Sequence, residues 1–127
     1  MIEYLNIHHV SLAVRDLTKA KQFYKEILQL QELTRPPFQS NGAWYAIGDQ
    51  QLHLIENPEG EALRKGPIHT QDSHFAVWVK SYRDTIDWLE QSGISYEARP
   101  ESVAGFSQIY ILDVDHHIIE FDAPYGS

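Results

Sequence analysis

Three histidines and one glutamate recur at matching places in the two halves of the chain. His9 and His74 each open a stretch of alternating residues, and they are 65 positions apart. His53 and Glu120 each lie between two apolar residues near the end of a half, and they are 67 positions apart. Two offsets so similar indicate that one module of about half the chain has been duplicated. Because imidazole and carboxylate groups bind divalent metals, the duplication predicts a metal site that draws on both copies.

Strand alternation places these four side chains on one side of the predicted strands. Side chains alternate between the two faces of a strand. An apolar residue directly follows each of the four in the sequence, so the apolar residues take the opposite face, which can pack on helices. A sheet that curls around the polar face would gather the candidate ligands His9, His53, His74 and Glu120.

The composition fits one small domain and excludes several kinds of site. A chain of 127 residues with 43% hydrophobic residues has enough apolar side chains for one core. The absence of cysteine excludes disulfides and thiolate ligands. A net charge of −8 argues against nucleic acid as a partner, because such binding relies on Lys and Arg contacts with phosphates.

The sequence also shows no sign of a membrane segment or an export signal. No apolar run approaches the roughly 20 residues that span a bilayer. The N-terminal residues lack the basic and apolar parts of a signal peptide. We therefore expect a cytoplasmic protein without a membrane partner.

The chain reads as two β-α-β-β-β modules, 1–60 and 72–127, joined by a polar link at 57–73. Together they form one predicted α+β domain over 1–127, whose mixed sheet curls as a half-barrel around the metal site with the helices outside. An amphipathic helix with an N-terminal cap follows the first strand of each module. The predicted strands are 7–14, 42–47, 51–56, 73–79, 95–99, 108–112 and 117–122, and the helices end near Leu28 and at Gly93.

These features resemble the vicinal-oxygen-chelate superfamily, which includes glyoxalase I, extradiol dioxygenases, fosfomycin-resistance enzymes and bleomycin-binding proteins. The resemblance rests on "HHVSLAVRDLTKAKQFY", "SHFAVWV" and "DVDHHIIEF", and it covers essentially the whole chain. It implies paired modules around one divalent metal held by His9, His74 and Glu120. It also implies a small-molecule substrate and a homodimer, with sites either within a chain or shared between chains.

Two positions depart from the superfamily pattern. His53 matches a fourth ligand position that is a glutamate in glyoxalase I. The turn at 113–116 reads Asp-Val-Asp-His, where the usual pattern is Asp-Pro-Asp-Gly, so we expect an altered local turn. His53 is either a fourth ligand or a residue within one water of the metal.

The remaining polar and aromatic candidates have simpler interpretations. We read the other histidines as hydrogen-bonded or solvated side chains, with His8 on the helix side of its strand and His116 and His117 at a turn. Glu56 is interpreted as a solvated residue at a strand end. Four aromatic residues either line a pocket or belong to the core: Trp44, Tyr45, Trp78 and Tyr110. Two arginines, Arg35 and Arg99, either meet a substrate carboxylate or cover the surface, and we favour the surface.

The ligand types predict the class of reaction. Two imidazoles and one carboxylate suit one divalent ion, whether Zn, Ni, Mn, Co or Fe, and leave positions open for a substrate. A substrate carbonyl or hydroxyl bound there would be stabilised as it gains negative charge. Glu120 would carry a proton between adjacent atoms, and His53 would act as a second base if its pKa lies near neutrality.

The number of open positions separates the candidate reactions. Extradiol cleavage needs three, for a bidentate catecholate and dioxygen, and ligation by His53 would leave two. The sequence therefore favours a glyoxalase-type enzyme with isomerase, lyase or epimerase chemistry on a small hydroxycarbonyl-like substrate. The alternatives are an extradiol-type dioxygenase and a bleomycin-resistance-like binding protein without catalysis.

Replacing His9, His74 or Glu120 by Ala should lower the metal content of the purified protein, because each change removes one of three ligands. Elemental analysis of freshly purified variants measures this. Full metal occupancy in all three variants would refute the predicted ligand set.

Overall fold

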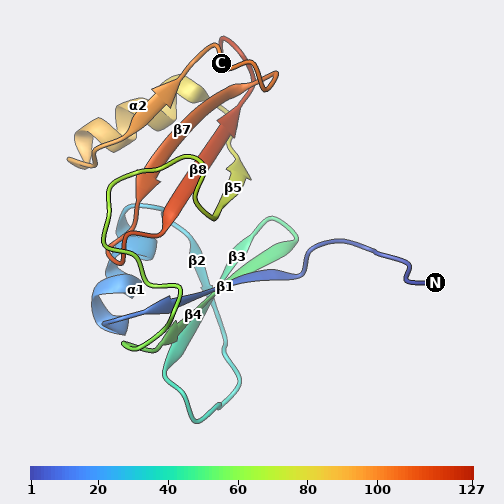
Figure 1. The fold of residues 1–127 in the computed structure, drawn as a ribbon, viewed down its shortest axis with the longest axis vertical. Helices are drawn as coiled ribbons and strands as arrows, with labels where there is room; N and C mark the ends of the chain where they lie inside the picture. Colours follow the sequence, from blue (N-terminus) through green and yellow to red (C-terminus); the bar gives the residue numbers. More distant parts are fainter. The chain divides into compact units, whose positions relative to one another are not determined.

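A computed structural model describes all residues from 1 to 127 and divides them into two compact units, Met1–Leu63 and Arg64–Ser127. Each unit contains one helix and one four-stranded mixed sheet. Figure 1 colours the first unit from blue to green and the second from yellow-green to red. Neither helix has the length and apolar character needed to cross a bilayer.

The two units share one topology. In each, the first and last strands are parallel neighbours, which requires a crossover connection, and the helix lies in that connection. This confirms the prediction of an α+β fold with two βαβββ modules. The first unit has strand order β1-β4-β3-β2, and its elements are β1 (His9–Val14), α1 (Leu17–Glu26), β2 (Gln31–Leu33), β3 (Gly42–Ile47) and β4 (Gln50–Glu56). The second has order β5-β8-β7-β6, and its elements are β5 (His74–Trp78), α2 (Tyr82–Gln91), β6 (Glu97–Arg99), β7 (Ser107–Leu112) and β8 (Ile118–Ala123).

The strand register repeats between the units as closely as the topology does. His9 on β1 pairs with Gln51 on β4, two residues before the candidate ligand of that strand. His74 on β5 pairs with Ile118 on β8, again two residues before the candidate ligand. Each opening histidine is therefore a diagonal neighbour of its partner, on the same face of the sheet.

Both helices begin at a side-chain cap and bury an apolar stripe. The Asp16 carboxylate accepts a hydrogen bond from the Lys19 backbone amide at 3.1 Å, and the Ser81 hydroxyl accepts one from the Asp84 amide, also at 3.1 Å. Such caps satisfy amides that have no partner within the helix. The buried helical residues are Ala20, Phe23 and Tyr24 in α1 and Ile86 and Leu89 in α2.

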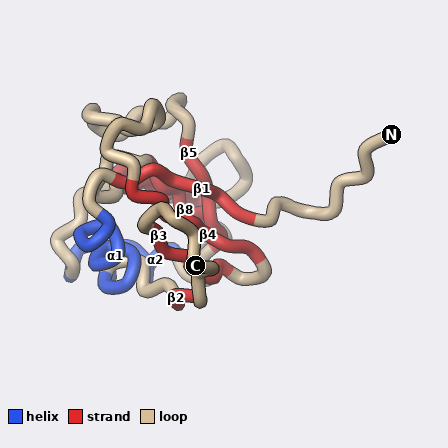
Figure 2. Tube along the Cα trace, turned by 90° about the horizontal axis from the view of Figure 1, so that it is seen from below, coloured by secondary structure: helices blue, strands red, loops and turns tan.

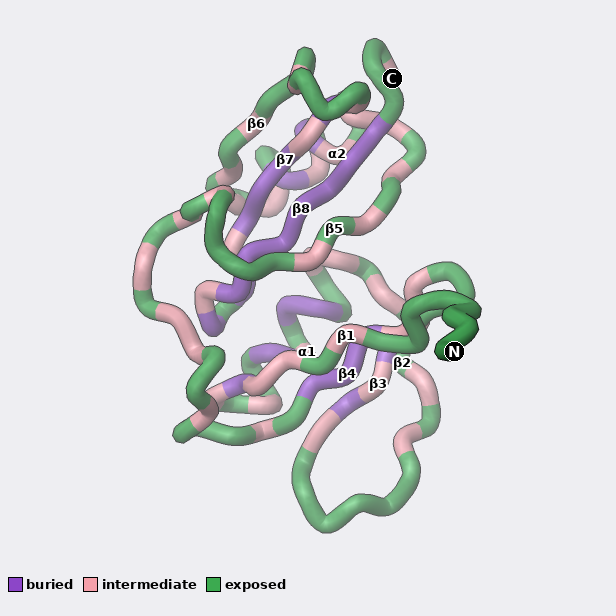
Figure 3. The backbone as a smooth tube through the Cα atoms, turned by 45° about the vertical axis from the view of Figure 1, so that its right-hand side comes forward, coloured by how far each residue is buried: buried purple, intermediate pink, exposed green.

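β8 is the most completely buried strand, and this matters for the charged residues that it carries. All six of its residues are buried, whereas the edge strand β5 alternates between exposed and half-buried positions (Figure 3). β8 lies between β5 and β7, so neighbours cover both of its sides. Glu120 and Asp122 therefore have exposed fractions of only 5% and 8%.

Several element ends shift by one or two residues from the sequence predictions, and three differences matter most. β2 was missed, because its three residues are too few for a clear alternating pattern, and it follows the helix after a short turn. The first strand begins at His9 rather than residue 7, and residues 1–8 form a loop that extends away from the sheet (Figure 2). Glu56 is not simply solvated, because its carboxylate accepts the Leu17 backbone amide at 2.8 Å and caps α1.

Replacing Gly42 by Ala should destabilise the first unit. A Cβ at Gly42 would collide with the Leu54 carbonyl oxygen and lie 2.8 Å from Nε of Arg35, so backbone would have to move. Overpacking of this kind costs about 1–3 kcal/mol. Gly66→Ala is the matched control, since the nearest atom to its Cβ would be Nη2 of Arg64, 4.0 Å away. Equal denaturation midpoints for the two variants would contradict the prediction.

Candidate metal centre

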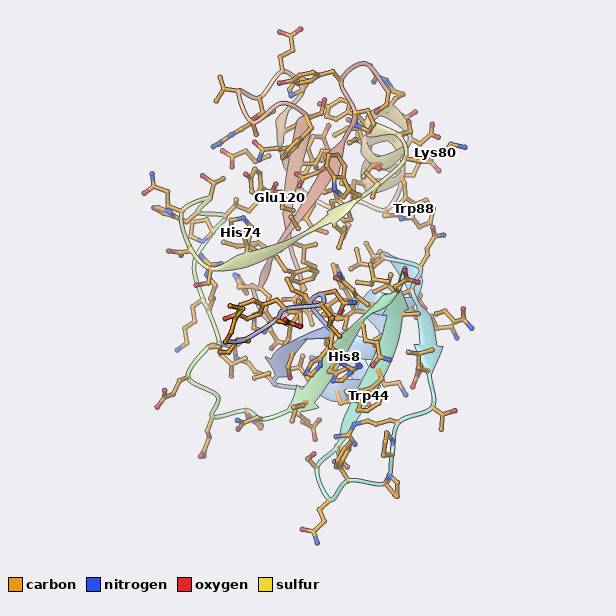
Figure 4. All side chains as sticks on the ribbon, turned by 90° about the vertical axis from the view of Figure 1, so that its right-hand side faces the viewer. His8, Trp44, His74, Lys80, Trp88 and Glu120 are labelled. Atoms are coloured by element: carbon orange, nitrogen blue, oxygen red, sulfur yellow. The ribbon has the colours of Figure 1, made fainter.

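The second unit brings His74 and Glu120 into direct contact. Nε2 of His74 on β5 lies 3.0 Å from Oε1 of Glu120 on β8, and Figure 4 shows the two labelled side chains on these neighbouring strands. The His74 side chain is 26% exposed and the Glu120 side chain is 6% exposed. The carboxylate is thus buried, while the imidazole keeps one side open to a ligand.

The hydrogen-bond partners of this pair leave two lone pairs facing each other. Nδ1 of His74 lies 2.8 Å from the Asp72 carbonyl oxygen, which can only accept, so Nδ1 carries a hydrogen. In a neutral imidazole Nε2 is then the lone-pair nitrogen. The other oxygen of Glu120 already accepts from Nε2 of Gln108 at 3.1 Å. Nε2 of His74 and Oε1 of Glu120 therefore need a proton or a cation between them.

The contact has the dimensions of two ligands on one metal ion. Metal bonds to imidazole nitrogen and carboxylate oxygen measure about 2.0–2.2 Å, so two such ligands at right angles lie about 3 Å apart. The observed separation is 3.0 Å. A proton on Nε2 would satisfy the same contact as an ion pair when no metal is present. The donor types and spacing of this pair therefore fit a divalent cation.

The groups around Glu120 favour its charged form. Burial opposes ionisation, but hydrogen bonds from Asp122, Gln108 and Tyr110 and the proximity of His74 hold the pKa of Glu120 below its usual value. Burial and the neighbouring Glu120 carboxylate raise the pKa of Asp122 to about 7 and that of Tyr110 to about 12. Tyr110 therefore remains a neutral donor at physiological pH, and the negative charge is concentrated on Glu120.

The first unit places His53 in a stack of rings on the same face as His9. The ring of His53 lies 4.0 Å from that of His9 and 4.1 Å from that of Trp44, measured between centroids. Nε2 of His53 lies 2.8 Å from the amide oxygen of Gln51 and so donates its hydrogen to it. Figure 4 labels Trp44, which belongs to this stack, and His8.

The stacked geometry bears on the predicted role of His53 as a fourth ligand. Ring-nitrogen lone pairs lie in the plane of an imidazole, and the planes of His9 and His53 are within 15° of parallel. Two such rings do not direct their lone pairs at one ion unless one of them turns. Burial, together with the charges of His9, His8 and Arg35, lowers the pKa of His53 to about 4. The condition for a second base, a pKa near neutrality, is therefore not met.

His8 and His117 were placed wrongly by the sequence interpretation. His8 precedes β1, so strand alternation does not apply to it, and its Nδ1 lies 2.8 Å from Nδ1 of His9. His117 is not solvated but buried, with an exposed fraction of 7%. Its backbone amide donates to the Asp113 carboxylate at 2.8 Å, within the turn between β7 and β8.

His116 explains how this turn tolerates a histidine where glycine is usual. Its φ of 63° lies in the left-handed region that glycine adopts freely. Two contacts hold it there: its Nδ1 lies 2.9 Å from the Gly66 carbonyl oxygen, and its own carbonyl accepts from Arg64 at 2.6 Å. The backbone conformation therefore agrees with the usual pattern, and the expected change in geometry is limited to these added contacts.

Each unit thus supplies two of the four predicted side chains. Within either unit alone, no group of three or more His, Asp or Glu side chains is arranged to hold a metal. Sequence reasoning missed the two amides that hold candidate side chains in place, Gln51 and Gln108, and it considered Trp44 only as a pocket or core residue. Amides and indoles have no spacing rule that would single them out.

Comparison with known proteins identifies the family. The family model described as "Glyoxalase/Bleomycin resistance protein/Dioxygenase superfamily" matches residues 6–121. The chain belongs to this superfamily. Among its curated members, metallothiol transferase FosB of Staphylococcus epidermidis is 29% identical over 122 residues, covering 94% of this chain and 82% of that protein. Fosfomycin resistance protein FosX of Listeria monocytogenes is 24% identical over 125 residues, covering 92% and 88%.

Solved structures of superfamily members show the same fold. A putative glyoxalase family protein from Bacillus anthracis matches with a TM-score of 0.78 and 22% identity, covering 98% of this chain and 99% of that one. Lactoylglutathione lyase from Agrobacterium tumefaciens matches with a TM-score of 0.70 and 19% identity, covering 93% and 92%. These likenesses confirm the architecture predicted from the duplicated motifs.

His53 should make the metal-free protein less stable in mild acid. Its pKa falls from 6.5 in the unfolded chain to about 4 in the folded chain. Between these values the unfolded chain gains a proton that the folded chain lacks. The free energy of unfolding therefore decreases as the pH is lowered, by at most about 1.4 kcal/mol per pH unit. Above pH 6.5 both states are neutral and the contribution is constant.

A comparison of variants isolates this contribution. His53→Phe keeps a ring beside Trp44, and its unfolding free energy should depend less steeply on pH between 6.5 and 4 than that of the unmodified protein. His69→Phe, at an exposed loop position, is the control and should keep the original slope. Identical slopes for all three chelator-treated proteins would contradict the prediction.

Proposed function

We propose that this protein is a divalent-metal-dependent enzyme of the glyoxalase type that acts on a small hydroxycarbonyl-like substrate. In this proposal His9, His74 and Glu120 hold one cation. The contact of Nε2 of His74 with Oε1 of Glu120 at 3.0 Å carries the proposal, because its two lone pairs call for a cation. The chain has a net charge of −8, and its acidic side chains cannot supply the positive charge that this contact needs.

Superfamily members support a metal and a small substrate. Two curated relatives are named metallothiol transferase and fosfomycin resistance protein. A glutamate-to-glutamine variant of the Listeria FosX was solved with Mn(II) and 1S,2S-dihydroxypropylphosphonic acid. Mn(II) is therefore the first metal to test here, and fosfomycin with a thiol or with water is the second substrate class after hydroxycarbonyl compounds.

The residues around the site have separate roles in this proposal. A bound divalent cation would stabilise negative charge that develops on a substrate oxygen. Glu120 would carry the proton, because it is the only carboxylate among the proposed ligands. Tyr110 and Gln108 would keep the carboxylate oriented. His53 would remain a neutral ring that flanks His9, since its pKa of about 4 leaves it unprotonated near neutral pH.

The orientation of the His53 ring also weakens the argument against extradiol dioxygenase activity. The sequence argument against extradiol cleavage relied on His53 as a ligand, and its stacked ring does not direct a lone pair toward an ion shared with His9. Three protein ligands would leave enough positions for catecholate and dioxygen. Oxygen uptake with catechols in the presence of Fe(II) therefore belongs in the substrate screen. The homodimer expected from the sequence stays a prediction, to be measured by light scattering.

Chelation should abolish turnover, and Mn(II) should restore it. The screen uses hydroxycarbonyl compounds, hemithioacetals, fosfomycin with thiols or water, and catechols. Glu120→Gln should reduce turnover by about 10²- to 10⁴-fold, the usual contribution of a proton-transferring group. Glu101→Gln, an exposed loop carboxylate in the same unit, is the control and should retain activity.

Two outcomes would refute the proposed metal-dependent enzyme. One is turnover that persists in the chelated protein. The other is tight binding of a small molecule, unaffected by chelation, with no turnover of any compound in the screen. The second result would identify a metal-independent binding protein of the bleomycin-resistance kind.

A further inference from the structure

We infer that Ser102 and Gln108 form a positioning pair that fixes the orientation of the Glu120 carboxylate, so that one of its oxygens faces His74. Nε2 of Gln108 donates to Oε2 of Glu120 at 3.1 Å, and this leaves Oε1 as the oxygen 3.0 Å from Nε2 of His74. The inference deepens the proposed function, since it rests on Glu120 being a ligand. Neither residue touches the proposed cation, so their effect passes through the carboxylate.

The direction of each hydrogen bond in this chain is fixed by chemistry. A carboxylate only accepts, so the amide nitrogen of Gln108 must be the atom that faces Glu120. The amide oxygen then faces Ser102, whose hydroxyl donates to it at 2.6 Å. The same hydroxyl oxygen accepts from the Ala104 backbone amide at 3.2 Å. Ser102 therefore holds the Gln108 amide in the orientation that the carboxylate requires.

The position of Ser102 is itself held from several sides. The Tyr125 hydroxyl donates to the Ser102 carbonyl oxygen. At the base of the same loop, the Ser107 hydroxyl donates to the Pro100 carbonyl oxygen at 2.5 Å. These bonds tie the loop before β7 to its own strand and to the C-terminal segment. Ser102 can thus act as a fixed anchor for the Gln108 amide.

The Ser102–Gln108 pair has no counterpart in the matching register of the first unit. Gln108 pairs with Asp122, and the residue in the matching register of the first unit is Gly42, which pairs with Ile55. Gly42 has no side chain with which to hold a ligand. In the first unit the amide that holds the candidate ligand comes instead from Gln51 on the same strand, whose oxygen accepts from Nε2 of His53 at 2.8 Å. Both candidate ligands thus have an amide partner, but only Glu120 takes it from the neighbouring strand, β7.

Metal affinity and a double-mutant cycle test the positioning role. Calorimetry with Mn(II) alone should show about 10- to 100-fold weaker binding in Gln108→Leu, the usual effect of losing a hydrogen-bond partner of a ligand. Ser102→Ala should weaken binding less, by severalfold. The double variant should match Gln108→Leu, because Ser102 acts only through Gln108. Gln91→Leu, at the exposed end of α2, is the control and should bind as the unmodified protein does.

A readout on the metal-free protein separates this inference from the proposed function. The side-chain amide protons of Gln108 should show protected, downfield NMR signals that shift toward free-amide values in Ser102→Ala and in Glu120→Ala. That result supports the positioning pair even if no metal binds, which would refute only the proposed function. Free-amide signals in the unmodified protein would overturn the inference. So would Mn(II) affinity within twofold of the original in Gln108→Leu, or additive losses in the double variant.

Discussion

The parallel pairing of the first and last strands of each unit is the constraint on which the candidate centre depends. It fixes His9 beside the strand of His53, and His74 beside the strand of Glu120, in one repeated register. A shift of one residue would turn every side chain of the strand to the other face. The buried apolar residues of β4 and β8 oppose such a shift, because it would expose them to water. Packing of the core therefore sets the spacing of the polar pairs.

The two units use the same register for different electrostatic environments. In the second unit a buried carboxylate is surrounded by donors and meets the lone pair of an imidazole. In the first unit a buried imidazole lies between two aromatic rings and is held neutral. The carboxylate of the second unit attracts a cation, and the neutral imidazole of the first unit does not repel one. This difference follows from a histidine in one copy and a glutamate in the other at one position.

The sequence was sufficient to predict the parts of this structure that repeat in the two units. The offsets of His9 and His74 and of His53 and Glu120 were enough to predict the modules and the shared faces, since alternation along a strand is a simple geometric rule. It did not reach the short strand β2 or the cap formed by Glu56, which depend on contacts distant in sequence. The stacking of His53 on Trp44 was equally out of reach, because side-chain rotation is set by neighbours across the sheet.

The start of each helix has a partner far along the chain. The first amide of α1 is bound by Glu56 at the end of β4, 39 residues away, and the first amide of α2 by the Ser127 hydroxyl, 45 residues away. During synthesis each helix therefore emerges before the group that completes its first turn. Its early amides remain hydrated until the last strand of the unit has been made. Each unit should then gain its final order in one cooperative step, which couples fraying of the helix to release of the strand beside its histidine.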